Sequence, residues 1–360
     1  MELKVLILPG DGIGVEVTRE ALRVLERVTY KFGHKLSYKE GLLGGIAIHK
    51  TGSPFPAETE KLALEADATL MGAVGLPEFD NAPPEERPEK GLLGLRKTLK
   101  VYANLRPVRA YKALLDSSPL KNHLVEGTDM IIVRELTGGL YYGTPRGISS
   151  SGPEERGVNT MAYTRAEIER VARIAFGLAR KRRKKLSSVD KSNVLEVSQL
   201  WRRVVTEVSK GFSDVALEHI LVDNCAMQLV LNPRRFDVVL TENMFGDILS
   251  DEGAVLAGSI GMLPSASIGD AKRPGVWVGL YEPVHGSAPD IAGQNKANPL
   301  GAIGSVAAML EYSFGLTKEA TAVNAAIEKV LSSGRVTADL KPTGKPATTE
   351  DVGKAICASL

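Results

Sequence analysis

The stretch FDVVLTENMFGDILSDE, residues 236–252, joins an apolar run to an acidic segment, and the rest of the chain is interpreted around it. Phe236–Leu240 is short and rich in β-branched residues, which is typical of a buried strand. Thr241–Asn243 supplies polar turn residues, and Asn243 is predicted to be the N-cap of a helix. The stretch therefore predicts a strand followed closely by a helix.

Two carboxylates lie four positions apart on this predicted helix. Asp247 and Asp251 would share one face, where two like charges repel by a few tenths of a kcal/mol. A hard divalent cation such as Mg²⁺ or Mn²⁺ would remove that repulsion, because these ions prefer oxygen ligands. The alternative is an acidic first turn set against the helix dipole. The stretch alone favours that alternative, so a metal site needs support from elsewhere in the chain.

Composition restricts the class of protein. The chain has 360 residues, of which 43% are hydrophobic and 24% charged, as expected for a globular protein with two domains. The net charge of +2 favours neither a nucleic-acid nor a membrane-surface partner. Two cysteines, Cys225 and Cys357, fit a reducing compartment. No apolar run reaches the ~20 residues of a membrane span, so a cytoplasmic location is predicted.

Strand-like and helix-like segments alternate along the chain. Leu3–Leu8 predicts a buried strand, residues 10–14 (GDGIG) a tight turn, and Val15–Phe32 an amphipathic helix. The glycine spacing is not the G-x-G-x-x-G of a Rossmann site. Thr164–Lys185 predicts a long helix that ends in a basic run. The alternation favours an α/β fold with a largely parallel sheet.

Three arginines are candidates for binding carboxylates. Arg96, Arg106 and Arg134 stand in LLGLR, NLRP and RELTGG. Each presents a planar fork that matches a carboxylate, so three would suit a substrate with two such groups. For any single arginine, ordinary ion pairing is the simpler interpretation.

A tyrosine and a lysine are candidates for proton transfer. Tyr141 follows a Gly-Gly pair and is able to donate a proton, whereas Tyr142 is the better candidate for a core aromatic. Lys191 follows an apolar strand and could act as a base when desolvated. Its alternative is a structural pair with Asp190. The loop from His285 to Asp290 is a candidate for a different role, because its small residues and its carboxylate could surround a nucleotide.

Six motifs occur in one order along the chain, at Gly10 (GDGIG), Asn104 (NLRP), Arg134 (RELTGGLYYGTPRG), Val189 (VDKSNVLE), Asn243 (NMFGDILSDE) and Glu282 (EPVHGSAPDIAG). Together they resemble the β-hydroxyacid oxidative decarboxylases, the isocitrate and isopropylmalate dehydrogenase family. The resemblance runs from Leu3 to the C-terminal helices.

The resemblance implies an α/β subunit with two domains and no Rossmann fold. Residues 1–101 plus 264–360 would form a first domain with the NAD-binding loop. Residues 102–263 would form a second domain with the substrate and metal site. An arm near residues 149–158 would join a homodimer whose active sites are shared between subunits.

The resemblance also implies a reaction and its cofactors. The reaction is oxidative decarboxylation of 3-isopropylmalate with NAD and Mg²⁺ or Mn²⁺. Tyr141 would be the acid, and Lys191 of the second subunit the base. Asp247 and Asp251, with Asp223 of the second subunit, would bind the metal, and Asp223 would also face the substrate. The residues expected at the cofactor are Glu89, Asn193, Glu282, His285, Gly286, Ser287, Ala288, Asp290, Ile291 and Asn298.

The chain departs from the family pattern at several positions. Val15 replaces a proline, Glu242 a glycine and Thr144 an acid, and the segment 270–279 is longer than is common. None of these removes a catalytic position. Glu242 adds a charge close to the expected metal ligands.

Two alternatives remain for the activity. Sibling enzymes act on homoisocitrate, isocitrate, malate or tartrate. Leu92, Leu93 and Val194 make the expected side-chain region apolar, which favours an isopropyl group. A catalytically silent subunit is the other alternative, but it would have lost a catalytic residue, and this chain has Tyr141, Lys191 and the three aspartates.

Overall fold

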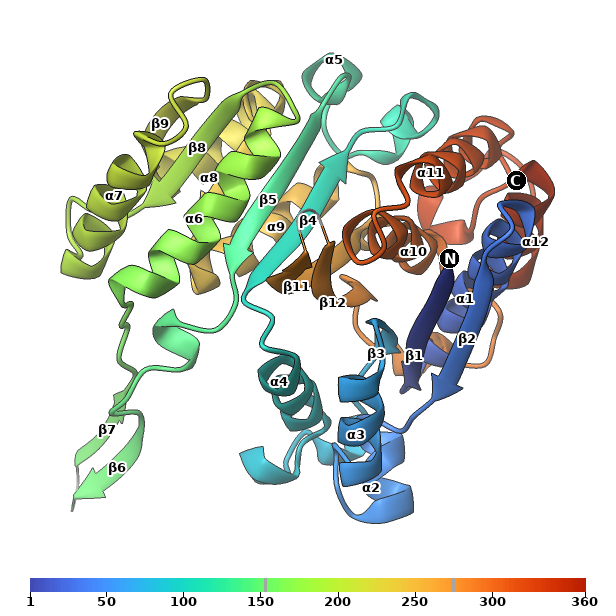
Figure 1. Ribbon diagram of the computed structural model, residues 1–360, viewed down its shortest axis with the longest axis horizontal. Coiled ribbons are helices and arrows are strands. Elements are labelled where there is room, and N and C mark those ends of the chain that lie inside the picture. The colour runs from blue at the N-terminus through green and yellow to red at the C-terminus, as the bar shows by residue number, and fades with distance from the viewer. Residues whose placement is uncertain (152–153, 274–275) are drawn as a thin grey trace. The chain divides into compact units, whose positions relative to one another are not determined.

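The computed structural model describes residues 1–151, 154–273 and 276–360 (Figure 1). It divides into two compact units. Unit 1 comprises Met1–Val101, Ala110–Pro119 and Ala254–Leu360, and unit 2 comprises Tyr102–Arg109 and Leu120–Gly253. The expected division placed residues 110–119 and 254–263 in the second domain. They pack with unit 1 instead, since the Ser117 hydroxyl donates to the Leu340 carbonyl at 2.8 Å.

The described part of unit 1 contains five strands in the order β2-β1-β3-β12-β11. The pairs β1–β2, β1–β3 and β3–β12 are parallel, and β11–β12 is antiparallel. The bounds are β1 Glu2–Gly10, β2 Lys35–Glu40, β3 Ala68–Ala73, β11 Pro264–Arg273 and β12 Val276–Pro283.

Strand β11 was not anticipated from the sequence. Its first residues, Pro264–Ser267, have small side chains with little intrinsic strand preference. They pair with β12 and pack against α10 (Leu300–Tyr312), so tertiary contacts make this strand. Residues 274–275, within the segment expected to be longer than usual, lie outside the described residues.

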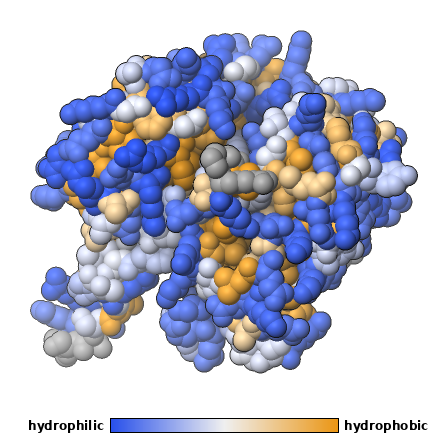
Figure 2. Space-filling model, viewed as in Figure 1, coloured by the Kyte–Doolittle hydropathy of each residue, from blue (hydrophilic) through white to orange (hydrophobic). Residues whose placement is uncertain are grey.

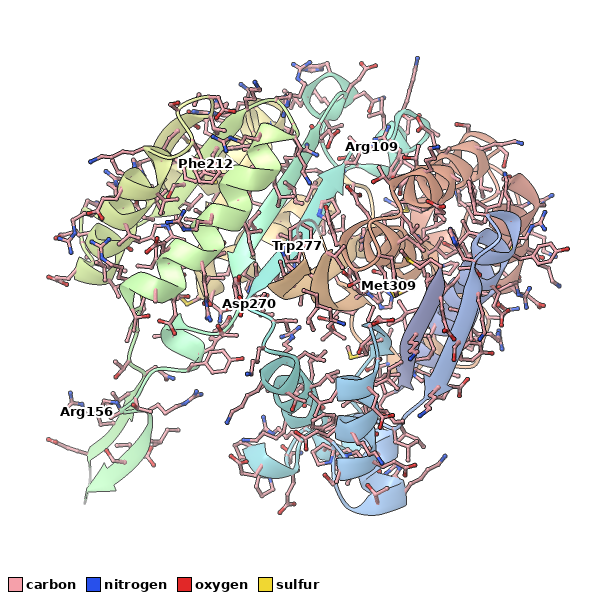
Figure 3. All side chains as sticks on the ribbon, viewed as in Figure 1. Arg109, Arg156, Phe212, Asp270, Trp277 and Met309 are labelled. Atoms are coloured by element: carbon pink, nitrogen blue, oxygen red, sulfur yellow. The ribbon has the colours of Figure 1, made fainter. Side chains whose placement is uncertain are left out.

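In unit 1, α1 (Gly14–Lys31) and α10 pack on the strands, and α11 (Thr317–Ser332) and α12 (Thr349–Ser359) pack against these helices. The apolar helix α10 is buried along most of its length and packs against β11 and β12. Met309 on α10 is fully buried, and Trp277 on β12 makes an edge contact with Tyr312 (Figure 3). Helices α2 (Gly45–Thr51) and α3 (Ala57–Glu65) lie beyond the arrowheads of β1 and β2 in Figure 1, and α4 spans Pro88–Leu99.

Among its described residues, unit 2 contributes five strands to the large sheet, in the order β4-β5-β10-β8-β9. β4 is antiparallel to β5, and the other pairs are parallel. The bounds are β4 Ala103–Arg109, β5 Asp129–Glu135, β8 Lys185–Asp190, β9 Ala216–Leu221 and β10 Val238–Thr241. The buried strand predicted from residue 236 is β10, whose four residues are all buried.

The helices of unit 2 cover both faces of these strands, with α6 in front and α8 and α9 behind (Figure 1). The bounds are α5 Asn122–Val125, α6 Arg165–Arg180, α7 Glu196–Ser209, α8 Val222–Leu231 and α9 Asn243–Leu256. Phe212 stacks on Phe176 of α6 with ring centroids 5.0 Å apart (Figure 3).

A β-hairpin projects from unit 2, as expected for the arm. Its strands are β6 (Gly147–Ser151) and β7 (Glu154–Val158). Arg156 extends from β7 into solvent (Figure 3), and the hairpin surface in Figure 2 combines hydrophilic areas with a hydrophobic one. Residues 152–153 of the expected arm lie outside the described residues.

Helix α6 ends earlier than predicted. It begins after the Thr164 cap, which forms a capping box with Glu167, and it ends at Arg180 rather than Lys185. The buried Asp237 carboxylate accepts from the Arg183 backbone N–H and the Arg182 guanidinium, both at 2.8 Å. These bonds turn the chain into β8, so the basic run forms a turn instead of a last helical turn.

Short 3-10 turns complete the structure, at Pro77–Phe79 (η1), Pro84–Glu86 (η2), Lys112–Ser117 (η3), Gly139–Tyr141 (η4), Pro233–Arg235 (η5), Ile260–Met262 (η6), Pro289–Ile291 (η7) and Ala338–Leu340 (η8). Across the described ranges, no helix has both the length and the apolar character required to cross a membrane.

Candidate functional site

In unit 2, two buried arginines converge on the acidic face of α9. Arg106 extends from β4 and Arg134 from the neighbouring strand β5. Arg134 Nη1 donates to Asp247, and Arg106 Nη1 lies 3.7 Å from Asp247 and 3.5 Å from Asp251. Two of the three arginines predicted to bind carboxylates are therefore brought together.

This arrangement corrects the argument from charge repulsion. Asp247 and Asp251 do share one face of α9, but the two guanidinium groups already compensate their charges. Their spacing by itself is therefore no evidence for a cation.

The predicted cap of α9 is also wrong. Asn243 is the first helical residue, and the Glu242 carboxylate accepts from the backbone N–H groups of Met244 (3.1 Å) and Phe245 (2.7 Å). Glu242 is 3% exposed, and burial raises its pKa. The departure at this position thus places an acid inside unit 2, where it caps the helix.

Tyr141 lies beside the same carboxylate. Its hydroxyl donates to Asp247 at 3.0 Å, and the Arg134 guanidinium lies 5.8 Å from its ring centroid. Burial and then the charge of Asp247 raise the pKa of Tyr141, so the phenol keeps its proton. The prediction that Tyr142 is a core residue is wrong, since it is 39% exposed. Tyr163 (7% exposed) packs against Gly138 and Gly139 instead.

Lys191 and Asp223 form a second cluster in unit 2. Lys191 Nζ donates to Asp223 at 2.6 Å, and this contact lowers the pKa of Asp223. The alternative pair of Lys191 with Asp190 is wrong, because Asp190 accepts from Arg202 at 2.9 and 3.0 Å. Asn193 and Val194 follow in the same exposed turn.

Within the described residues, no three acidic, histidine or cysteine side chains gather as a metal site. The structure brings Asp247 and Asp251 together on α9, whereas Asp223 lies in the first turn of α8 beside Lys191. The side chains of Asp223 and Asp251 are each 62% exposed, so both carboxylates face solvent.

The third arginine lies in unit 1. Arg96 extends from α4 and donates from Nη2 to Glu282 of β12 at 2.7 Å. Its Nε is buried, and no hydrogen-bond acceptor for it occurs among the described residues. An unpaired buried donor is costly unless a ligand satisfies it. Leu92 and Leu93 lie on the same helix, and Leu93 is 42% exposed.

The GDGIG turn contacts the loop expected to hold a dinucleotide and two other segments of unit 1. The Asp11 carboxylate accepts from the backbone N–H groups of Gly45 and Ile46 (both 2.8 Å) and Gly75 (2.9 Å). Ile13 N–H donates to the Ser287 carbonyl at 2.8 Å. A Cβ on Gly12 would lie 2.1 Å from that carbonyl oxygen, so only glycine fits there.

Glu89 lies near this loop. A Cβ on Gly75 would be 3.3 Å from Glu89 Oε1 and 3.5 Å from Ser287 Oγ. The structure therefore brings two residues predicted to contact the cofactor to one glycine.

His285 has an unused nitrogen. Its Nδ1 pairs with the Gly286 carbonyl at 2.9 Å, while the buried Nε2 has no partner among the described residues. Burial lowers the pKa of His285, which favours the neutral ring. Asp290 is exposed with Gly286 and Ala288, and Ile291 is half-buried.

Asn298 is already engaged within unit 1. Its amide donates to Asp339 at 2.9 Å and accepts from the Leu300 backbone N–H at 3.0 Å, at the start of α10. These bonds give Asn298 a structural role in this loop.

Sequence reasoning missed four residues that fix the site. Asn104 and Asn243 accept from the Nε atoms of Arg106 (2.8 Å) and Arg134 (2.9 Å), and Ser250 accepts from Arg106 Nη1 at 2.5 Å. The fourth is Asp11. The i, i+2 spacing of Asn104 and Arg106 on one strand was a usable signal, whereas the partner of Asn243 is 109 positions away.

The chain is similar to known proteins over nearly its full length. The isocitrate/isopropylmalate dehydrogenase family matches residues 4–356. The 3-isopropylmalate dehydrogenase of Geobacillus kaustophilus is 58% identical over 95% of this chain and 91% of its own length. That of Aquifex aeolicus is 55% identical over 98% and 96%.

Solved structures of related dehydrogenases have the same fold. Isocitrate dehydrogenase from Methylococcus capsulatus has a TM-score of 0.87 at 32% identity, covering 99% of both chains. A β-decarboxylating dehydrogenase from Thermococcus kodakarensis has a TM-score of 0.80 at 38% identity, covering 99% of this chain and 96% of its own. The chain is an oxidoreductase and belongs to the isocitrate/isopropylmalate dehydrogenase family.

Proposed function

We propose that this enzyme catalyses the NAD-dependent oxidative decarboxylation of 3-isopropylmalate to 4-methyl-2-oxopentanoate, a step of leucine biosynthesis. The observation that carries the proposal is the convergence of Arg106, Arg134 and Tyr141 on Asp247. It combines groups for a dicarboxylate with a proton donor. The names and identities of the relatives from G. kaustophilus and A. aeolicus support the substrate.

Asp247 and Asp251 are the proposed ligands of Mg²⁺ or Mn²⁺, with Asp223 of a second subunit. The donor set fits, because all three supply carboxylate oxygens and Asp251 is largely exposed. Bound there, the cation supplies electrophilic stabilisation of negative charge on substrate oxygens. Full activity of the enzyme in EDTA would contradict the proposed requirement for a divalent metal ion.

The side chains of the protein bind the substrate carboxylates and transfer the protons. Arg96, Arg106 and Arg134 bind the two carboxylates. Lys191 of the second subunit accepts the proton of the substrate hydroxyl, and Tyr141 donates its phenolic proton to carbon after CO₂ has left. Tyr141→Phe is expected to impair this last step more than hydride transfer. Parental turnover to final product in that variant would refute the assignment.

The dinucleotide is assigned to unit 1, and the substrate carboxylates and metal mainly to unit 2. The buried His285 Nε2 without a partner among the described residues, and the approach of both Glu89 and Ser287 to Gly75, support a ligand at this loop. The remaining residues proposed to contact the dinucleotide are Glu282, Gly286, Ala288, Asp290, Ile291 and Asn298 of unit 1 and Asn193 of unit 2. NAD⁺ would be the oxidant of the reaction.

Discrimination against NADP is assigned to Asp290. Its carboxylate would accept from ribose hydroxyls and repel a 2′-phosphate. Lys296 would weaken that repulsion if it reached the 2′-phosphate, and its ammonium is held by the Gln294 side chain at 2.8 Å. We expect at least about a tenfold preference for NAD in kcat/KM. Asp290→Lys with Ile291→Tyr should move the preference toward NADP, and equal values in the parent would contradict the role.

The substrate class has a direct test. NADH formation is measured with 3-isopropylmalate, malate, tartrate, isocitrate and homoisocitrate, with and without Mn²⁺. Leu92, Leu93 and Val194 are proposed to contact the isopropyl group, which is worth about 1–3 kcal/mol over malate. A higher kcat/KM for any sibling substrate would replace the proposal by that activity.

A homodimer with shared active sites is part of the proposal. It is supported by exposed apolar side chains on α8 and α9 and by the β6–β7 hairpin, where Ile148 is 82% exposed. It would place Lys191 and Asp223 of one subunit in the site of the other. Two free cysteines support a reducing, cytoplasmic location.

A further inference from the structure

We infer that Asn243 is a positioning residue that sets the proton donor Tyr141 and the carboxylate-binding Arg134 in one geometry. The inference deepens the proposed function and rests on it. It concerns a side chain that is 1% exposed and is not assigned to substrate, metal or cofactor.

The first contact of Asn243 fixes Arg134. Its Oδ1 accepts from Arg134 Nε at 2.9 Å, within the buried part of unit 2. Because Nε is occupied, the far side of the planar guanidinium, with Nη1, faces Asp247. The amide thereby sets the rotation of the fork that would bind a substrate carboxylate.

The second contact fixes the turn that carries Tyr141. Asn243 Nδ2 donates to the Leu136 carbonyl at 3.2 Å and to the Gly138 carbonyl at 3.0 Å. The same turn is held from its N–H side, where Glu135 accepts from Thr137 N–H (3.0 Å) and Gly138 N–H (2.7 Å). The backbone leading to Tyr141 is thus fixed by buried side chains on both sides.

One amide therefore joins three parts of the site, because Asn243 begins the helix that carries Asp247. Asn104 offers a natural comparison. It accepts from Arg106 Nε at 2.8 Å in the same way, from the strand that also carries that arginine. Asn104 is thus expected to orient an arginine, whereas Asn243 orients an arginine and an acid.

Two substitutions separate the two roles of Asn243. Asn243→Asp keeps an acceptor for Arg134 Nε but loses both donors to the Tyr141 turn. Asn243→Ala loses all three bonds. Asn104→Ala is the comparison variant, because it removes the acceptor of Arg106 Nε. Circular dichroism and thermal unfolding are used to test whether each variant is folded.

The readouts are steady-state kinetics and a partial reaction. The partial reaction is exchange of the C3 hydrogens of 4-methyl-2-oxopentanoate in D₂O, followed by NMR with Mn²⁺ and NADH at saturating keto acid. This exchange uses the Tyr141 proton transfer without hydride transfer. Displacement of a positioned group by about 1 Å typically costs on the order of a hundredfold.

We expect Asn243→Asp to lower the exchange rate and kcat by about tenfold to a hundredfold, with KM for 3-isopropylmalate changed less than about threefold. Asn243→Ala should lower the exchange rate and also raise KM. Asn104→Ala should raise KM while the exchange rate stays near that of the parent.

A double-mutant cycle with Tyr141→Phe tests whether Asn243 acts through Tyr141. In the Tyr141→Phe background, Asn243→Asp should lower the residual exchange no further. An equal loss in both backgrounds would overturn the inference, as would parental exchange in Asn243→Asp or failure of both Asn243 variants to fold. If the parent itself neither turns over 3-isopropylmalate nor exchanges C3, the proposed function fails and the inference fails with it.

Discussion

Glu242 is a buried acid where the family pattern usually has glycine. Its carboxylate caps α9, and its pKa is raised by burial, with the nearby Glu135 acting in the same direction. A raised pKa means that the folded protein binds this proton more tightly than the unfolded chain does. The associated stability is present below pH 4.5, the ordinary value, and is lost as the pH rises through the folded pKa.

Glu242→Gln removes this titration and keeps one acceptor for the cap. We therefore expect the free energy of unfolding of the variant, minus that of the parent, to increase as the pH rises from 4.5 toward 8. Urea unfolding at a series of pH values measures the difference. Glu86→Gln, on an exposed 3-10 turn, is the control. A difference that does not change with pH would contradict this account.

The two carboxylates of helix α9 differ in how many contacts they make within the folded protein. Asp247 is bonded to Arg134, faces Arg106 and accepts from Tyr141, whereas Asp251 has one distant guanidinium contact and is 62% exposed. Loss of the Asp247 charge would leave the buried Arg134 without the carboxylate to which it is bonded, and Arg106 without one of the two carboxylates near it. Loss of the Asp251 charge would leave a solvated helix face.

Asp247→Asn is expected to reduce the free energy of unfolding by about 1–2 kcal/mol, after allowance for solvent screening. Asp251→Asn should change it by less than about 0.5 kcal/mol. Both variants should lose Mn²⁺-dependent turnover at ordinary metal concentration. Denaturant unfolding and NADH formation measure the two properties. Equal destabilisation by the two substitutions would show that Asp247 does not anchor the arginines.

At the scale of the whole molecule, unit 2 presents an apolar surface on two helices. Met227 and Leu231 of α8 and Ile248 of α9 are 50%, 56% and 59% exposed. Exposed apolar side chains of this kind mark contact sites between proteins when they form one surface. A second copy of the chain is the proposed partner.

Ile248→Asp should shift the enzyme from dimer to monomer, because a buried unpaired carboxylate is costly in an apolar interface. Activity should fall with dissociation, since Lys191 and Asp223 would no longer reach the other subunit's site. Leu64→Asp is the control, because Leu64 is 66% exposed on α3 of unit 1. Sedimentation velocity measures the change, and a dimer that survives Ile248→Asp would place the interface elsewhere.

The sequence by itself determined the order of motifs, most of the strands and helices, and the family. These depend on local patterns: β10 is a short β-branched run, α1 is amphipathic, and the glycines of the GDGIG turn permit close approach. Local preference and periodicity are properties of neighbouring residues, so they can be interpreted without a structure.

Only the tertiary structure decided which groups meet. Arg134 and Asp247 are 113 positions apart, and the arginine compensation of Asp247 follows from the packing of α9 against β5 and β4. The same is true of Glu242 as the cap in place of Asn243, of the early end of α6 at Asp237, and of β11, whose residues have weak strand preference. The partner of a charged or polar side chain depends on which elements the topology places beside it, because hydrogen bonds and ion pairs act over a few ångströms of space and not along the chain.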